Sequence, residues 1–190
     1  MTPVPSALRP FDTVFLDRDG TINVKAPEDD YITTPDDLIL LPGAGKAIRA
    51  LNQAGFMVVV VTNQRGVALG RLSTRRLDLV HRRLRSLLAA NGARIDAIYS
   101  CPHDLGACRC RKPLPGLLQQ AQVDMPKIDL RRAVTIGDSE ADVRAGQAAA
   151  TATVRLGPTD VLTEADFHCS DLVEATDLIL HDSHVIHLCP

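Results

Sequence analysis

Three cysteines and one histidine fall within a stretch of ten residues. They supply three thiolates and an imidazole: Cys101, His103, Cys108 and Cys110. This is a complete tetrahedral ligand set for Zn²⁺, and a set that leaves no position for water is structural rather than catalytic. The sequence therefore predicts a zinc-binding loop that holds the neighbouring chain in place. Thiols without a metal are the alternative, although a disulfide between Cys108 and Cys110 would close a small, strained ring.

Carboxylates directly follow two short apolar runs of the chain. Asp17 and Asp19 stand two residues apart after the first run, so both side chains face the same way, and Asp138 follows a later run. An ionised carboxylate can attack phosphorus and form an aspartyl phosphate. Because a negative nucleophile repels a phosphate dianion, a divalent cation must lie between them, and carboxylate oxygens favour Mg²⁺. An ordinary turn is the alternative interpretation of residues 17–21.

A transferring phosphoryl group also needs hydrogen-bond donors. Thr62 and Asn63 end another apolar run and offer a hydroxyl and backbone amides, while Lys112 offers a compact positive charge. Ser139, in the loop after the fourth run, is a further candidate for the phosphate site. Asp142 follows one helical turn later, and we expect it to lie behind the cation ligands.

Apolar runs rich in β-branched residues alternate with longer amphipathic segments. We expect strands at the runs 13–16, 56–61, 95–99, 133–136 and 151–154. We expect helices that begin near residues 43, 73, 116, 139 and 171. Continuous apolar runs suit strands that helices cover on both faces, so the pattern predicts an α/β fold with a Rossmann-like parallel sheet and helices on both faces. The carboxyl ends of parallel strands share one edge, which would bring the polar side chains together.

The length and composition fit one domain. With 190 residues, 45% of them hydrophobic, the chain can build one sizeable core. We expect a single domain over residues 1–190, with a core at about 11–156 and a C-terminal helix and tail at 157–190. Only about forty residues separate the first expected strand from the second, so we expect no large cap domain over the site.

The charge and cysteine content exclude several classes of partner. The formal net charge is -2 and only 3% of the residues are aromatic, which argues against a nucleic-acid partner. Six arginines on an amphipathic segment predict a solvated helix face: Arg71, Arg75, Arg76, Arg82, Arg83 and Arg85. An odd number of cysteines, without a secretory leader or a long apolar stretch, predicts reduced thiols and no membrane span. We expect a cytoplasmic monomer that acts on a small molecule.

The order of the motifs resembles the haloacid dehalogenase superfamily of phosphotransferases over residues 11–156. The two carboxylates of Asp17 and Asp19 are followed in turn by Thr62, Lys112 and Asp138, each after its own apolar run. The resemblance implies that Asp17 is the nucleophile and Asp19 the general acid and base. It also implies that Mg²⁺ is held by Asp17, the main-chain carbonyl of Asp19 and Asp138.

The predicted zinc loop narrows the resemblance. Its Cys-x-His and Cys-x-Cys spacing before Arg-Lys-Pro looks like the histidinol-phosphatase and heptose-bisphosphate phosphatase group. The segment 62–70 is similar to the Thr-Asn-Gln-Ser-Gly-Ile-Ala-Arg-Gly pattern of the heptose enzymes. This resemblance implies Mg²⁺-dependent removal of the 7-phosphate from D-glycero-D-manno-heptose 1,7-bisphosphate, in the biosynthesis of nucleotide-activated heptose. Gln64 would belong to the substrate site, and Arg111, with Arg65 as a helper, would bind the second phosphate.

The chain departs from this pattern at several positions. Arg65 and Leu69 replace the usual serine and arginine, the loop between the predicted ligands at 103 and 108 is short, and the segment 25–31 is long and acidic. A histidinol-phosphate phosphatase is therefore the alternative activity. An inactive, zinc-stapled binding module and a nucleic-acid end phosphatase are further alternatives. Because one residue separates Cys110 from Lys112, we expect zinc loss to disturb the phosphate site as well.

Overall fold

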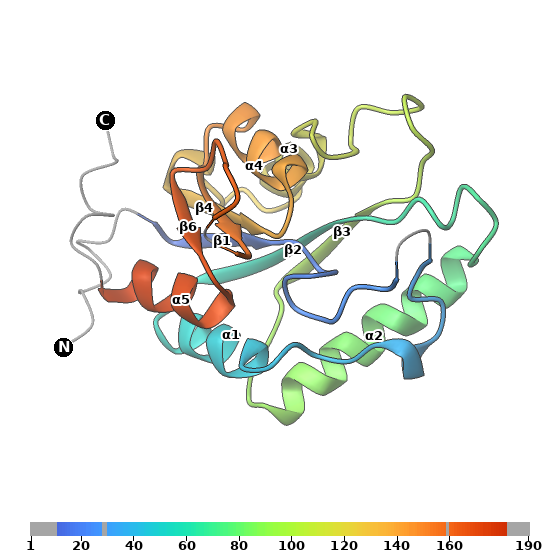
Figure 1. Ribbon diagram of the computed structural model, residues 1–190, viewed down its shortest axis with the longest axis horizontal. Helices are drawn as coiled ribbons and strands as arrows, with labels where there is room; N and C mark the ends of the chain where they lie inside the picture. Colours follow the sequence, from blue (N-terminus) through green and yellow to red (C-terminus); the bar gives the residue numbers. More distant parts are fainter. Residues whose placement is uncertain (1–10, 28–29, 159, 182–190) are drawn as a thin grey trace.

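The computed structural model describes residues 11–27, 30–158 and 160–181, and its centre is a parallel β-sheet (Figure 1). The strands are β1 (Thr13–Leu16), β2 (Met57–Asn63), β3 (Ala97–Cys101), β4 (Ala133–Gly137), β5 (Ala152–Leu156) and β6 (Phe167–Cys169). They lie in the order β3-β2-β1-β4-β5-β6, and every neighbouring pair is parallel. The predicted parallel sheet is confirmed. The short edge strand β6 was not expected.

Helices cover both faces of the sheet, as predicted. They are α1 (Ala44–Gln53), α2 (Thr74–Ala90), α3 (Gly116–Asp124), α4 (Glu140–Ala148) and α5 (Leu172–His181). α1, α2 and α5 lie on one face, and α3 and α4 lie on the other (Figure 1). The expected caps are present: Ser73 begins α2 by accepting a hydrogen bond from the Arg76 N–H, and α2 ends before Asn91.

The two faces of the sheet build two hydrophobic clusters. Phe15, Val59 and Val61 pack toward α3 and α4, whereas Val14 and Val58, with their alternate neighbours, pack toward α1, α2 and α5. All of these side chains are fully buried. This alternation explains why the central strands are uninterrupted apolar runs, because both faces of each strand are covered.

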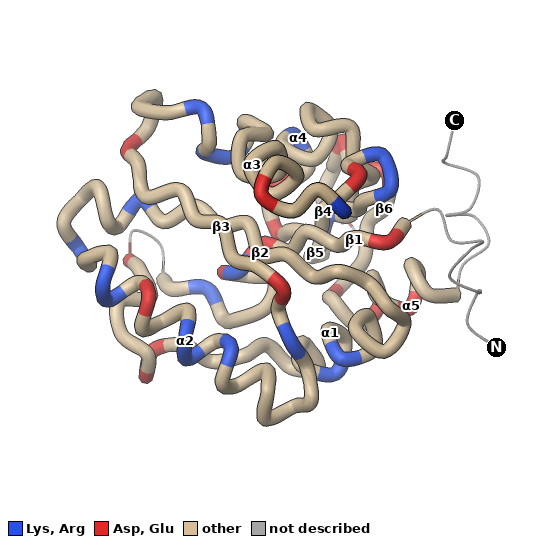
Figure 2. The backbone as a smooth tube through the Cα atoms, turned by 180° about the vertical axis from the view of Figure 1, so that it is seen from behind, with Lys and Arg blue, Asp and Glu red and all other residues tan. Residues whose placement is uncertain are grey.

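The arginine-rich segment is the solvated face of α2, as predicted. Arg75, Arg76, Arg82 and Arg83 are exposed, while the intervening Leu77 packs into the protein interior. Figure 2 marks basic positions along this helix in blue. Among the described residues, no helix is long and apolar enough to cross a bilayer.

The order of the strands determines where the polar residues at the strand ends lie. β1 has β2 on one side and β4 on the other, so the direction of winding reverses at β1. Ligands of open α/β sheets bind beyond the carboxyl ends of the strands at this point. Asp17 directly follows β1, and Asp138 directly follows β4. The two carboxylates therefore meet at one edge of the sheet.

Candidate active site

A cleft of about 560 Å³ opens at the carboxyl ends of β1, β2 and β4. It is lined by all of the predicted catalytic, magnesium-binding and phosphate-binding residues except Arg65. Its further walls come from the segment after β1, where Lys25, Asp30 and Tyr31 line the cleft. The sequence reasoning noted the unusual length of that segment but did not assign its residues to the site.

Three carboxylates converge at the base of the cleft. Ligand oxygens of Asp17, Asp138 and Asp142 all lie within 4.8 Å of one another. Gly20 makes the approach possible, because its φ is +86° and a Cβ there would collide with the Asp138 carboxylate. A cluster of hard oxygen ligands fits Mg²⁺. The structure thus places Asp142 within the cluster rather than merely behind it.

Lys112 is the buried cation that faces this cluster. Its ammonium donates hydrogen bonds to Asp17 Oδ1 at 2.7 Å and to the Val61 carbonyl oxygen at 2.8 Å. It also lies 2.5 Å from Asp142 Oδ1. Burial alone would lower the pKa of Lys112, but the charges of Asp17 and Asp142 outweigh burial and raise it. The ammonium therefore stays charged at neutral pH, as phosphate binding requires.

The nucleophile candidate is destabilised as an anion. Burial raises the pKa of Asp17 to about 7, the charge of Lys112 opposes this rise, and the charge of Asp142 adds to it. A divalent cation beside the three carboxylates would supply the missing positive charge and favour the ionised form. The charge balance of the residues present therefore fits the magnesium ion that the sequence predicts.

Asp19 lies outside the three-carboxylate cluster, and its carboxylate accepts hydrogen bonds from four donor atoms. Arg18 donates through Nε and Nη2 at 2.9 to 3.2 Å, Asn23 Nδ2 donates at 2.9 Å, and Gln64 Nε2 donates at 3.0 Å. Arg18 is only 1% exposed. Sequence reasoning missed Arg18 and Asn23. The signal was an arginine directly between two functional aspartates.

The predicted phosphate-binding side chains other than Arg65 lie at the cleft, and several of them already bind other protein groups. Thr62 Oγ1 accepts a hydrogen bond from Gln64 at 2.9 Å. The Ser139 hydroxyl donates to Asp142 Oδ2 at 2.5 Å and belongs to the capping box of α4. The Asn63 side chain pairs with the main chain of Lys112. These bonds fix the shape of the phosphate-binding wall before any ligand arrives.

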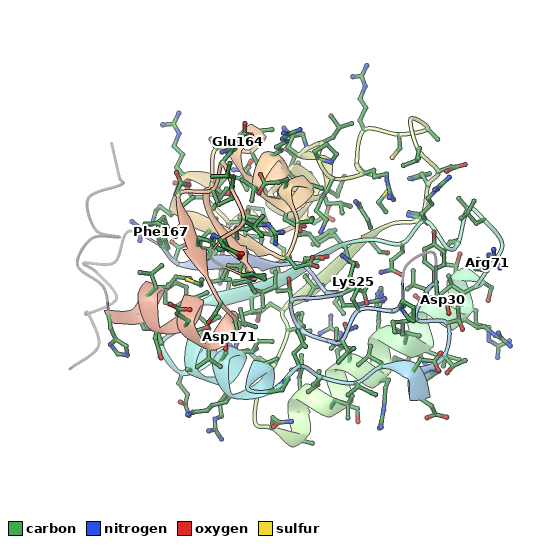
Figure 3. The ribbon with its side chains drawn as sticks, viewed as in Figure 1. Lys25, Asp30, Arg71, Glu164, Phe167 and Asp171 are labelled. Atoms are coloured by element: carbon green, nitrogen blue, oxygen red, sulfur yellow. The ribbon has the colours of Figure 1, made fainter. Side chains whose placement is uncertain are left out.

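A cation that the sequence reasoning missed sits at the mouth of the cleft. Lys25 Nζ donates to Asp138 Oδ2 at 3.0 Å, although its side chain is 62% exposed. Partial burial lowers the pKa of Lys25, but the hydrogen bond and the charge of Asp138 outweigh burial and raise it. Figure 3 shows Lys25 and Asp30 on the loop that leaves the carboxyl end of β1. Lys25 and Lys112 together face three carboxylates, so negative charge remains in excess.

The predicted zinc ligands form a second cluster, the Cys/His loop (residues 101–110). The Cys101 and Cys108 sulfurs are 3.5 Å apart, and those of Cys108 and Cys110 are 3.3 Å apart. His103 Nδ1 is 3.6 Å from the Cys101 sulfur and 3.3 Å from the Cys110 sulfur. These separations are close to the distance of about 3.8 Å between sulfurs on a tetrahedral Zn²⁺. The donor set and its spacing fit the metal.

The thiols of this loop are reduced in the structure. No disulfide joins cysteines in the described part of the chain, where Cys101, Cys108, Cys110 and Cys169 are free thiols. Burial opposes the ionisation of Cys108, but hydrogen bonds from the Cys110 thiol and from main-chain N–H groups outweigh burial and lower its pKa to about 6. A thiolate ready for metal is therefore favoured at Cys108. Cys189 lies outside the described residues.

The two arginines expected at the second phosphate lie in different places. Arg111 lines the cleft, and its Nη1 is buried without a hydrogen-bond partner among the described residues. Arg65 lies outside the lining, and its Nε is 2.6 Å from Asp104 Oδ1 in the Cys/His loop. Arg111 is therefore placed to meet a ligand, whereas Arg65 is engaged by the protein itself.

Parallel strands in this order, with an aspartate-rich cleft where the winding reverses, define the class of protein: a phosphatase of the haloacid dehalogenase superfamily. The D,D-heptose 1,7-bisphosphate phosphatase of B. bronchiseptica, solved with magnesium and phosphate, superimposes with a TM-score of 0.80 at 34% identity. The match covers 89% of this chain and 98% of that one. Residues 12–181 match the family model described as polynucleotide kinase 3 phosphatase, so the chain belongs to this family.

Curated relatives share one reaction and differ in the anomer that they process. A D-glycero-beta-D-manno-heptose-1,7-bisphosphate 7-phosphatase of Rhodopseudomonas palustris is 40% identical over 155 residues, which cover 77% of this chain and 84% of the relative. The corresponding alpha enzyme of Mycobacterium tuberculosis is 37% identical over 150 residues, covering 76% of this chain and 78% of the relative. The predicted family and enzyme class are confirmed.

Proposed function

We propose that this protein hydrolyses the 7-phosphate of D-glycero-D-manno-heptose 1,7-bisphosphate on the route to nucleotide-activated heptose. The observation that carries the proposal is the set of heptose bisphosphate phosphatases that match most of the chain, together with an intact carboxylate cluster in the cleft. All four catalytic positions hold competent residues: Asp17, Asp19, Lys112 and Asp138. The alternative of an inactive binding module has no support in this site.

Asp17 would attack the phosphorus atom. Its Oδ would form a bond to phosphorus while the bond from phosphorus to the sugar oxygen breaks, which leaves an aspartyl phosphate. Lys112 would bind the oxygens of the transferring group and limit charge repulsion, because its ammonium is already 2.7 Å from the attacking carboxylate. Burial of both side chains strengthens that electrostatic effect.

Asp19 would carry protons in both half-reactions. It would give a proton to the departing sugar oxygen and then take one from the water that attacks the aspartyl phosphate. The second displacement releases inorganic phosphate and restores the Asp17 carboxylate. Arg18, Asn23 and Gln64 would keep Asp19 at the wall of the cleft, away from the cation ligands.

The magnesium ligands would be Asp17, the main-chain carbonyl of Asp19, and Asp138, with Asp142 close to them. When bound, the ion would neutralise the carboxylates and orient the phosphoryl oxygens. The three carboxylates within 4.8 Å support this assignment. Structural Zn²⁺ would be held by the Cys/His loop, whose ligands leave no open position for substrate.

The second phosphate of the substrate would meet Arg111. This arginine lines the cleft, and its unpaired Nη1 offers a donor in the fork geometry that suits phosphate oxygens. Arg65 does not share this role in our proposal, because it binds Asp104 instead. We further propose that the enzyme is a single domain and acts as a cytoplasmic monomer, in keeping with its free cysteines.

A phosphate-release assay on a panel of substrates tests the proposed function. We expect the highest kcat/KM with heptose 1,7-bisphosphate in the presence of Mg²⁺, and lower values with histidinol phosphate and with a 3′-phosphorylated oligonucleotide. Both anomers of the bisphosphate belong in the panel, because the relatives include both. Equal or greater efficiency with histidinol phosphate or the oligonucleotide would overturn the proposed substrate.

Arg111→Met separates the bisphosphate from monophosphate substrates. We expect this variant to raise KM for the bisphosphate by about tenfold, since a lost charge-assisted hydrogen bond costs on the order of 1.5 kcal/mol. KM for a heptose 7-monophosphate should change little. An equal effect on both substrates would contradict the assignment of Arg111 to the second phosphate.

A further inference from the structure

Asn63, the last residue of β2, and the two residues after it bind either the Cys/His loop or Lys112, two positions beyond the loop. The Asn63 side chain donates to the Lys112 carbonyl oxygen at 3.0 Å and accepts from the Lys112 N–H at 3.1 Å. The Gln64 N–H donates to the Cys101 carbonyl oxygen at 2.8 Å. Arg65 Nε is 2.6 Å from Asp104 Oδ1. The first residue of the loop, the turn inside it and the chain just beyond its last ligand are thus fastened to one short segment.

The Asn63 contact acts on the backbone of the phosphate-binding lysine. Its amide satisfies both the N–H and the C=O of Lys112, as a neighbouring strand would, while the Lys112 ammonium is fixed separately by Asp17 and by the Val61 carbonyl oxygen. The lysine is therefore held at both its main chain and its charged end. Phosphate binding depends on the position of that ammonium, so the main-chain contact bears directly on the active site.

The Arg65 contact explains two departures of the chain together. Arg65 stands where the heptose enzymes usually carry serine, and the loop between His103 and Cys108 is short. The structure joins these two departures, because Arg65 binds Asp104, which lies within the shortened segment. One departure therefore supports the other.

We propose that Asn63 and Arg65 are positioning residues that fasten the Cys/His loop to β2, so that the metal-bound loop sets the position of Lys112. Asn63 fixes the main chain of Lys112, two positions beyond the last residue of the loop. Arg65 fixes the turn between the first two and the last two metal ligands. The inference concerns phosphate and zinc only, so it stands or falls independently of the sugar that the enzyme accepts.

The test uses the zinc-loaded protein with two readouts besides turnover. The affinity for inorganic phosphate in the presence of Mg²⁺ is measured by calorimetry, and the rate of zinc transfer to a coloured chelator is measured by absorbance. For Asn63→Ala we expect phosphate affinity to fall by about tenfold, as for the loss of two hydrogen bonds of about 0.7 kcal/mol each. We also expect KM to rise together with the phosphate dissociation constant, and zinc release to accelerate.

Asn63→Asp and Asn52→Ala serve as graded and matched controls. Aspartate keeps an acceptor for the Lys112 N–H but loses the donor to its carbonyl oxygen, so this variant should weaken phosphate binding as well. Asn52 also binds main chain, through the Arg94 N–H, but lies away from the cleft. Asn52→Ala should leave phosphate affinity and zinc release unchanged. Phosphate affinity within twofold of the parent for a folded Asn63→Ala protein would overturn the proposal for Asn63.

Arg65→Ser tests the other end of the loop. Because the ion pair is partly exposed, we expect zinc release to accelerate only by about threefold and phosphate affinity to change little. Asp104→Asn should give the same effect, and combining the two changes should add nothing further. Arg71→Ser, which alters an exposed arginine nearby in the chain, is the matched control. Unchanged zinc release in Arg65→Ser, or additive effects in the double variant, would overturn the role of Arg65.

Discussion

The three-carboxylate cluster and the Cys/His loop lie at the same edge of the sheet and differ in what they leave open. Asp17 and Asp142 are buried, and the three carboxylates of the cluster face only two lysines, Lys112 and Lys25, so negative charge remains in excess at a cleft that a ligand can enter. The thiols and imidazole of the loop instead face one another at 3.3 to 3.6 Å. The carboxylate cluster has unbalanced negative charge, whereas the Cys/His loop has a complete set of four ligands.

In the proposed assignment, this difference gives the two metals of one fold two separate tasks. Oxygen ligands beside an open cleft fit a hard cation that also touches substrate oxygens. Sulfur ligands that surround a metal completely contribute to folding and position. The two tasks meet at Lys112, which lies two positions after the last residue of the loop and binds Asp17. The following predictions test how sharply the two roles are divided.

Removing the nucleophile should have the largest effect. Asp17→Asn should lower kcat on the order of 10⁴-fold or more, because an amide does not form the phosphoenzyme, while the fold remains intact. The measurement is phosphate release together with circular dichroism, and mass spectrometry of quenched wild-type enzyme should place the phosphoryl group on Asp17. Asp36→Asn, at an exposed carboxylate, is the control. Activity near the wild-type level would remove Asp17 from its role.

Acidic pH should destabilise the fold through the partly buried histidine His81. Burial, with the charge of Arg18 adding to it, lowers the pKa of His81 from 6.5 to about 4. The folded protein therefore favours neutral His81, and its contribution to stability is complete above pH 6.5 and is lost as the pH falls toward 4. Between pH 7 and pH 5 this residue should cost about 2 kcal/mol of unfolding free energy.

Urea denaturation at the two pH values measures this effect. His81→Gln should lose less stability than the parent between pH 7 and pH 5, by about 2 kcal/mol. His168→Gln, at a histidine on the edge strand β6, is the matched control. If the stability of His81→Gln falls with pH as steeply as that of the parent, His81 does not titrate as the structure indicates.

Zinc removal should affect both clusters, although only one of them loses its metal. We expect a zinc-free sample to keep the sheet but to lose about tenfold in kcat/KM at saturating Mg²⁺, because Lys112 is displaced by on the order of 1 Å. The unfolding temperature should also fall. Metal content by plasma emission and thermal melts accompany the kinetics. Unchanged kinetics in a zinc-free sample would show that the two clusters are independent.

Replacing Lys25 should have the smallest effect. Its ammonium binds a carboxylate oxygen of Asp138 that Mg²⁺ would also need, so Lys25→Met should strengthen divalent-ion binding by about threefold. Calorimetry with Mg²⁺, or Mn²⁺ spin resonance, measures the affinity directly. Lys46→Met, on the exposed side of α1, is the control. Weaker metal binding in Lys25→Met would assign a supporting rather than a competing role to this lysine.

The sequence indicated the sheet and most of the cleft because apolar runs mark buried strands and strand ends mark the site. Asp17, Asp19 and Asp138 could be placed from this rule alone. β6 could not, since its three residues include His168 and are too short to show a period. Arg18 also escaped notice, because a buried arginine is rare and its burial comes from tertiary packing.

Side-chain contacts between distant parts of the chain depend on geometry that no local pattern contains. Lys25 reaches Asp138 from 113 positions away along the chain, and Arg65 reaches Asp104 from 39 positions away. Sequence reasoning placed Arg65 with the substrate, because an arginine in that motif suggests phosphate binding. The carboxylate that occupies it comes from another loop. Prediction of a ligand for an arginine therefore needs an account of which protein anions compete for it.

Gly20 has a consequence for how this family can vary. The residue carries no charge and contributes no side chain to the chemistry, yet any added carbon would occupy the space of the Asp138 carboxylate. In a saturation mutagenesis screen, position 20 should therefore be as intolerant as the nucleophile itself. The absence of a Cβ at position 20 is therefore as necessary to the site as the catalytic groups. A search that looks only for reactive side chains would not find this requirement.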